Sequence, residues 1–352
     1  MPVLALWCAI CAMATFAIRE LGFSRLKKYP VTALVLFLSL ASFPLGGMYK
    51  LSRPYHKRIL TFIRREKSAP ILRSGCPVFP PDNIWNRRIV DLPLDANSRA
   101  YISSMGSGDK LHADFGGGGG YRYTVTNGGE PSIDLSVGSA AESDPGPYRI
   151  PDSAYIEDGS DGHVLVLDRG DCFLYELAGA ARTGPERWSA GSASIFDLRS
   201  NRLRPEGWTS ADAAGTAILP GLVRYEEVAE GRIPHALRFT TRHTRRAFVW
   251  PARHFASNST DPSLPPMGQR FRLKAAVDLS QFSAQTRVIL TALKEYGMIL
   301  SDNGGNWYVS GALDSRWPGS MPGELATLHG SDFEAVDVSG LMINPDSGLA
   351  RQ

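Results

Sequence analysis

The chain is poor in cysteine and lacks the short motifs that identify a reaction. Of four cysteines in 352 residues, Cys8 and Cys11 lie in an apolar run, so only Cys76 and Cys172 belong to the rest of the chain. Gly-x-Ser-x-Gly, His-Glu-x-x-His and phosphate-loop motifs are missing, and no Cys-x-x-Cys pair follows the apolar run. These absences exclude the nucleophile-elbow hydrolases, the zincins and the P-loop enzymes.

An excess of charge of one sign is also missing from most of the chain. The formal net charge is +3, and residues 50–67 hold seven basic residues against a single acid, Glu66. The remainder is close to neutral, so we expect no nucleic-acid partner. There is no repeat of fixed period, and 35 glycines and 24 prolines are scattered as turn signals. This composition excludes collagen-like and low-complexity chains and favours many short strands.

Two long apolar runs, at residues 3–18 and 31–48, begin the chain. Each is long enough, or nearly so, to cross a bilayer core of about 30 Å, and neither has the polar face of a globular helix. We therefore predict two membrane or signal segments over residues 1–49 and a basic linker over 50–75. The second run also has the layout of a secretory signal peptide, whereas in a two-helix hairpin the basic linker would favour the cytoplasm. Of these two arrangements we favour export, and we expect an extracytoplasmic protein that is secreted or membrane-anchored.

Residues 76–352 are predicted to form a single β-rich globular domain. Its two cysteines permit one disulfide in an oxidising compartment, and two buried free thiols are the alternative. One long helix is expected over residues 283–296, because Ser283 is a suitable N-cap and Gly297 stands where a C′ glycine belongs. Its apolar stripe includes Val288, Ile289 and Leu293. We expect a mainly β fold, a β-sandwich or jelly-roll-like sheet pair, with this helix packed against it. The strand-like runs are 121–125, 163–168, 172–177, 194–198, 236–240, 247–250, 270–277, 298–300 and 307–310.

Several segments of the domain form a distinctive set. Phe-Pro-Pro-Asp-Asn-Ile-Trp-Asn stands at 79–86, Gly-Trp-Thr-Ser-Ala-Asp-Ala-Ala-Gly at 207–215 and Tyr-Gly-Met-Ile-Leu-Ser-Asp-Asn-Gly at 296–304. Together with shorter matches between them they span nearly the whole domain, and they resemble an uncharacterised family of secreted bacterial proteins with no known activity. The resemblance implies export and one compact domain, and it carries no catalytic residues.

Candidate site residues are ionisable side chains at predicted strand ends. His112 and Asp114 share one face of an extended segment, as a metal-binding pair or a base with its orienting carboxylate, or as a hydrogen-bonded loop pair. His235 and Arg238 lie on one side of a predicted hairpin and His254 on the other. The guanidinium of Arg238 at this hairpin could bind the carboxylate of a uronic acid or another anion through two parallel hydrogen bonds. Alternatively, it forms a salt bridge within the protein.

Aromatic side chains beside polar groups are typical of sugar sites. The loop from Asp302 to Trp307 combines carboxylate, amides and an indole face, although a plain hairpin turn explains the same residues. Trp250 stands beside the predicted hairpin. His163, at the mouth of another strand, favours a structural role.

These observations predict an exported or membrane-tethered carbohydrate-active enzyme, a glycoside hydrolase or polysaccharide lyase acting on an extracellular or cell-wall glycan. No cofactor and no metal site are expected, and the membrane would be contacted through the N-terminal segments. A non-catalytic glycan-binding or cell-surface interaction domain stays open, as does a metal-dependent hydrolase. The predicted catalytic residues are Asp302, His112 and Asp114, and the predicted substrate-binding residues are His235, Arg238, His254, Trp250 and Trp307.

Overall fold

A computed structural model of the chain describes residues 72, 74–117, 119–158 and 161–352. They belong to a compact unit that spans Ser68–Gln352. The two apolar segments and nearly all of the basic linker predicted from the sequence lie outside the described residues. Within the described part of the chain, no helix has the length and apolar character needed to cross a membrane.

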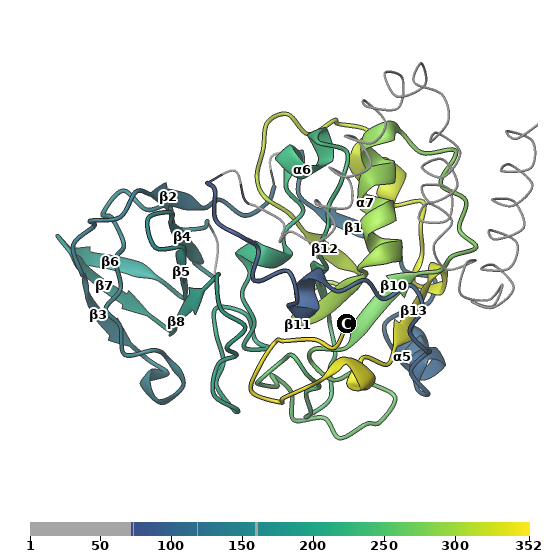
Figure 1. Cartoon of the computed structure of the whole chain (residues 1–352), viewed down its shortest axis with the longest axis horizontal. Coiled ribbons are helices and arrows are strands. Elements are labelled where there is room, and N and C mark those ends of the chain that lie inside the picture. The colour runs from purple at the N-terminus through teal and green to yellow at the C-terminus, as the bar shows by residue number, and fades with distance from the viewer. Residues whose placement is uncertain (1–71, 73, 118, 159–160) are drawn as a thin grey trace, which may run out of the picture. The chain divides into compact units, whose positions relative to one another are not determined.

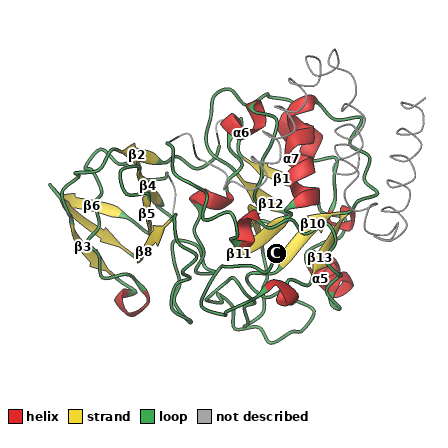
Figure 2. Ribbon diagram, viewed as in Figure 1, coloured by secondary structure: helices red, strands yellow, loops and turns green. Residues whose placement is uncertain are grey.

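The described chain is mainly β, with three mixed sheets and few helices (Figures 1 and 2). The six-stranded sheet has the order β1-β12-β9-β11-β10-β13, the four-stranded sheet β2-β4-β5-β8 and the three-stranded sheet β3-β7-β6. In chain order the strands are β1 His112–Asp114, β2 Thr124–Thr126, β3 Asp134–Val137, β4 Val164–Asp168, β5 Phe173–Ala178, β6 Ala181–Gly184, β7 Arg187–Ala190, β8 Ser192–Asp197, β9 Leu237–Thr241, β10 Arg270–Leu273, β11 Met298–Asn303, β12 Tyr308–Ser310 and β13 Phe333–Val336. The α-helices are α5 Ser98–Ser104, α6 Tyr225–Ala229, α7 Ala284–Glu295 and α8 Met321–Leu325.

The prediction of a mainly β domain is confirmed at this level. Eight of the nine predicted strand runs overlap a strand. The run at 247–250 does not, because Phe248 makes only an isolated bridge with Met267. Parallel pairs join β1 to β12 and β9 to β11, and antiparallel pairs join β9 to β12 and β10 to β11. This mixture differs from the antiparallel order of a jelly roll.

Helix α7 lies where the N-cap and glycine signals predict a helix, and it packs against β10 (Figure 1). The Ser283 side chain accepts a hydrogen bond from the Thr286 backbone N–H, and Ile289 and Leu293 are buried. Gly297 has φ of 65°, and a Cβ there would meet the Phe271 carbonyl oxygen at 2.1 Å. Only glycine fits this turn, which leads the chain from the helix directly into β11.

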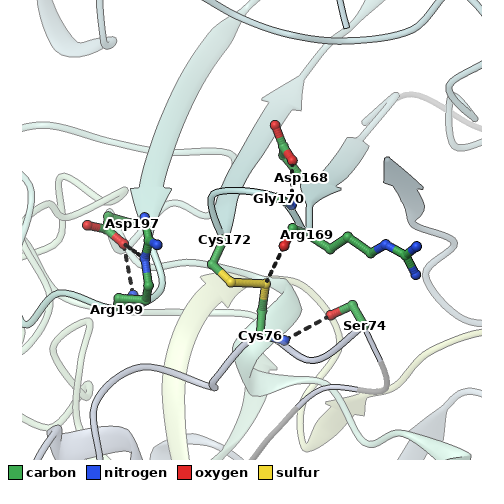
Figure 3. Close-up of a disulfide and its surroundings, with 8 residues drawn as sticks. All are labelled: Ser74, Cys76, Asp168, Arg169, Gly170, Cys172, Asp197 and Arg199. Atoms are coloured by element: carbon green, nitrogen blue, oxygen red, sulfur yellow. Dashed lines mark hydrogen bonds and ion pairs between the residues drawn. A yellow bond between two sulfur atoms is a disulfide. The ribbon is translucent and has the colours of Figure 1, made fainter. Parts of the chain in front are cut away.

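Cys76 and Cys172 form a disulfide across 96 residues, with their Cα atoms 5.5 Å apart. Figure 3 shows Cys172 at the turn between β4 and β5, and Cys76 on the segment that leads into the domain. Cys76 is fully buried, and Leu72 is buried in the same apolar cluster. The bond therefore fastens the first described residues to the four-stranded sheet, and the packed domain begins slightly before the predicted boundary at Cys76.

Candidate functional site

One face of the six-stranded sheet carries most of the ionisable residues predicted for the site. Residues paired across neighbouring strands point to the same face, and the face alternates along each strand. Asp114 pairs with Ser310, and both Tyr308 and Asp302 pair with Thr240. Arg238 lies two residues from Thr240 and therefore on its face. We call Asp114, Ser310, Arg238 and Asp302 the polar face. The opposite face carries Phe239, Leu300 and Val309, which belong to the main apolar core.

A β-bulge determines that Asp302 belongs to the polar face. Leu300 pairs with Phe239 and Asp302 pairs with Thr240, so Ser301 is an extra residue in β11. Without the bulge, strict alternation would place Asp302 on the same side as Leu300, in the core. The extra residue reverses the alternation and directs the carboxyl group toward Arg238.

Arg238 is held by a buried ion pair with Asp212. Its Nε lies 2.8 Å from both Asp212 carboxylate oxygens, and only 2% of Arg238 and none of Asp212 is exposed. The other donors reach the Ser310 hydroxyl and Asp302 Oδ2, the latter at 3.4 Å. Burial alone would lower the pKa of Arg238, but the charge and hydrogen bonds of Asp212 together with the neighbouring Tyr121 and Asp302 raise that pKa overall, so the guanidinium stays cationic. Removing one partner of such a pair costs about 3–5 kcal/mol, since the other charge stays buried.

Two carboxyl groups flank this guanidinium, and both are easier to protonate than in water. Burial and the neighbouring charge of Asp212 raise the pKa of Asp302 to about 7, against the opposing charge of Arg238. Burial also raises the pKa of Asp114, again against Arg238. A carboxyl group that keeps its proton near neutral pH is what a general acid requires.

His163 approaches the same cluster from β4's N-terminal side. Nδ1 contacts the Glu157 carboxylate, and Nε2 lies 3.3 Å from the Ala211 carbonyl oxygen. Burial would lower the pKa of His163, but the hydrogen bond to Glu157 and its charge raise it overall. Both ring nitrogens face oxygen acceptors, which is the environment of an imidazolium. The Tyr121 ring lies 5.5 Å from the His163 ring and 5.3 Å from Arg238 Cζ, so it links the two cations.

Glu176 lies behind the cluster and is fully buried. Its carboxylate accepts backbone hydrogen bonds from Ile218 and Leu219 at 2.9–3.0 Å. Burial raises the pKa of Glu176 to about 7, and these two hydrogen bonds oppose the rise. Asp212 adds to it through its charge. Acidic groups therefore continue beneath the polar face.

The structure places two predicted substrate-binding histidines in structural roles. His235 has no exposed surface, and its nitrogens lie 2.7 Å from the Ala236 carbonyl oxygen and 2.7 Å from Arg224 Nη2. His254 Nδ1 lies 2.9 Å from the Ala213 carbonyl oxygen. Both histidines contact backbone carbonyl oxygens. His235 precedes β9, and its Nε2 also lies 3.1 Å from the Glu227 carboxylate, so it belongs to a buried cluster with Arg224 and Glu227 and not to the polar face.

The predicted role of Trp307 as a sugar platform also needs correction. The indole is fully buried and donates to the Met105 carbonyl oxygen at 3.0 Å, so it has no face free for a ligand. Trp250 is half-buried and donates to the Ser347 carbonyl oxygen at 2.8 Å. Both tryptophans serve the packing of the domain.

The aromatic surface beside the polar face is formed by Tyr308 and His112 instead. Tyr308 is 37% exposed, and its ring stacks on that of His112 with centroids 4.5 Å apart. The two residues are paired in the sheet, so both lie on the face of Asp114 and Arg238. The sequence did not single out Tyr308. Strand alternation decides which of the adjacent Trp307 and Tyr308 faces outward, and it depends on where β12 begins.

Other segments contribute partners that the sequence did not single out, which are Asp212, Tyr121, Glu157 and Glu176. The only available signal was position: Asp212 lies in the distinctive 207–215 segment and Tyr121 directly follows the glycine run at 116–120. The described residues include no group of three or more His, Cys, Asp or Glu that could hold a metal ion. Two open surface grooves are lined by other residues, among them Lys274 and Phe282 in one and Leu135 and Tyr148 in the other. The site is therefore defined by the polar face.

Comparison of the chain with protein-family models, with curated proteins and with solved structures found no match.

Proposed function

We propose that this protein is an exported or membrane-tethered carbohydrate-active enzyme that cleaves an extracellular or cell-wall glycan. The observation that carries the proposal is the polar face, where Asp114 and Asp302 stand on either side of the buried Arg238. Paired carboxyl groups with different environments are the catalytic equipment of most glycoside hydrolases. A polysaccharide lyase is the second form of the proposal. The proposal also includes the more detailed architecture expected from the sequence, a sandwich-like pair of sheets.

In the hydrolytic reaction Asp302 is the general acid. Its proton passes to the glycosidic oxygen as the bond from that oxygen to the anomeric carbon breaks. A water molecule adds to the anomeric carbon, and Asp114 accepts the proton that this water loses. Arg238 stabilises the carboxylate that Asp302 becomes, since its Nη2 lies 3.4 Å from Oδ2. Asp212 holds the guanidinium in place.

The spacing of the two carboxyl groups favours inversion at the anomeric carbon. Asp114 and Asp302 lie on β1 and β11, with β12 and β9 between them. Three strand spacings and an offset of two residues along the strands separate their main chains by about 16 Å. Both side chains lie on the face of Arg238, and this wide spacing fits the separation of about 6.5–9.5 Å in inverting enzymes better than the roughly 5 Å of retaining ones.

Tyr308 and His112 provide the surface for a sugar ring. Tyr308 is partly exposed beside the carboxyl groups, and a tyrosine face packs well against a pyranose ring. This assigns His112 to binding. The catalytic role that the sequence suggests for it is not part of the proposal.

Export is supported by three observations. The disulfide between Cys76 and Cys172 is a bond that persists in oxidising compartments outside the cytoplasm. The distinctive segments resemble secreted bacterial proteins, and the apolar segments before the domain fit a signal or an anchor.

The experiment is a screen of the full chain against neutral, amino-sugar and uronic-acid polysaccharides, with Asp302→Asn and Tyr308→Ala alongside. The proposal expects Asp302→Asn to abolish turnover, because asparagine keeps the shape but cannot deliver a proton. It expects Tyr308→Ala to raise KM with a smaller change in kcat. Retention of a glycan without cleavage, unaffected by Asp302→Asn, would favour the non-catalytic binding domain instead. The metal-dependent alternative has no donor cluster among the described residues on which to rest.

A further inference from the structure

We infer that the glycan cleaved at the polar face carries no carboxylate groups, and that the reaction is hydrolysis and not elimination. The inference rests on the proposed function and narrows it. It follows from the engagement of Arg238 and from the balance of charge around it.

Arg238 has too few free donors to recognise a uronic acid. A guanidinium has five N–H bonds, and carboxylate recognition uses two parallel ones. Nε donates to Asp212, Nη2 is shared between Asp212 and Asp302, and Nη1 donates to Ser310. At most one N–H is left, and the group is 98% buried, since only 2% of Arg238 is exposed. A substrate carboxylate would have to displace Asp212, which has no exposed surface.

The charge of the site repels a further anion. Four carboxyl groups interact with the two cations of the cluster, Arg238 and His163. These carboxyl groups belong to Asp114, Glu157, Asp212 and Asp302. Even with Asp302 protonated as the general acid, the acids outnumber the cations. Like charges within a few ångströms in a partly buried site cost several kcal/mol, whereas a neutral sugar meets no such cost and an amino sugar is attracted.

The same balance opposes the lyase reaction. Elimination removes the proton next to the uronate carboxylate, and the negative charge that develops needs a cation or strong donors to stabilise it. The only guanidinium of the cluster is already neutralised by Asp212. Hydrolysis needs only an acid for the leaving oxygen and a base for water, and Asp302 and Asp114 supply these.

The test compares polymers that differ only in their carboxylates. The full chain is incubated with polygalacturonate, glucuronan and alginate, and with the same three polymers after chemical reduction of each carboxylate to an alcohol. Chitin, chitosan and neutral β-glucans complete the panel. New reducing ends report hydrolysis, and the ultraviolet absorbance of unsaturated sugars reports elimination. Asp302→Asn serves as the inactive control. Asp91→Asn makes the same chemical change at an exposed position and should keep the activity.

The inference expects cleavage of at least one polymer without carboxylates, with kcat/KM at least about tenfold above that for any uronate polymer, and no unsaturated product. For chitosan, KM should rise with salt between about 20 mM and about 200 mM, as screening weakens the attraction. Preferred cleavage of a uronate polymer, or any unsaturated product that Asp302→Asn abolishes, would overturn the inference while the proposed enzyme stands. Absence of cleavage across the whole panel would overturn both.

Discussion

Replacing Asp302 with asparagine should stabilise the folded protein at alkaline pH while it abolishes turnover. Burial raises the pKa of this carboxyl group from 3.8 to about 7. Between these two pH values the folded protein holds a proton that the unfolded chain has released, so the free energy of unfolding falls as pH rises. The cost of the buried carboxylate is therefore absent below about pH 4 and complete above about pH 7.

The size of the effect follows from the same numbers. A tenfold change in proton affinity corresponds to about 1.4 kcal/mol, so the rise from 3.8 to about 7 corresponds to about 4 kcal/mol. The Asp302 side chain is 24% exposed, and water around it relieves part of that cost. We expect about 2 kcal/mol for Asp302→Asn at about pH 8 and almost no change at about pH 4.

Urea denaturation of the variant and the parent protein over this pH range measures the difference directly. Asp91→Asn controls for the general effect of removing a negative charge. Loss of stability in Asp302→Asn at every pH would refute the reasoning, because Asp302 would then be an ionised structural partner of Arg238. In the parent protein, turnover should decline as pH rises through about 7, since the general acid loses its proton there.

Four further predictions concern the scaffold and the reaction. Replacing Cys76 and Cys172 together by serine opens a loop of 96 residues and should lower the free energy of unfolding in urea by about 2–5 kcal/mol; an unchanged midpoint would contradict a formed disulfide. Leu293→Ala should cost about 2–5 kcal/mol in the same assay, and a loss below about half a kcal/mol would mean that α7 does not bury this side chain. Trp307→Ala should cost about 3–5 kcal/mol of stability, whereas Tyr308→Ala should mainly raise KM; the reverse pattern would restore the indole as the sugar platform. Proton NMR of the first product should show an inverted anomer, and retention would place the two carboxyl groups closer together than the strand spacing implies.

Local features of the fold could be predicted because they depend on neighbours in sequence. The N-cap at Ser283, the apolar stripe through Leu293 and the glycine at 297 together specify α7, and the structure has a helix there. Alternating β-branched and aromatic runs likewise mark most strands. The even number of cysteines in the domain allowed a disulfide, but free thiols satisfied the sequence equally well.

The choice of Asp114, Arg238 and Asp302 as site residues came from their chemical types, and only the tertiary structure decided how they meet. Asp302 reaches the polar face because of one extra residue, Ser301, and no local pattern announces that bulge.

Trp307 lies in the core and Tyr308 at the surface for a similar reason, since a shift of one residue turns a side chain from surface to core. Asp212 lies 26 residues from Arg238 in the chain, yet it accepts hydrogen bonds from Nε and Nη2, which the sequence had left free for a substrate. Residue types and local periodicity were thus determined by the sequence alone. Which face each side chain occupies, and which charges are already paired, depend on contacts between distant segments, and those form only when the sheets assemble.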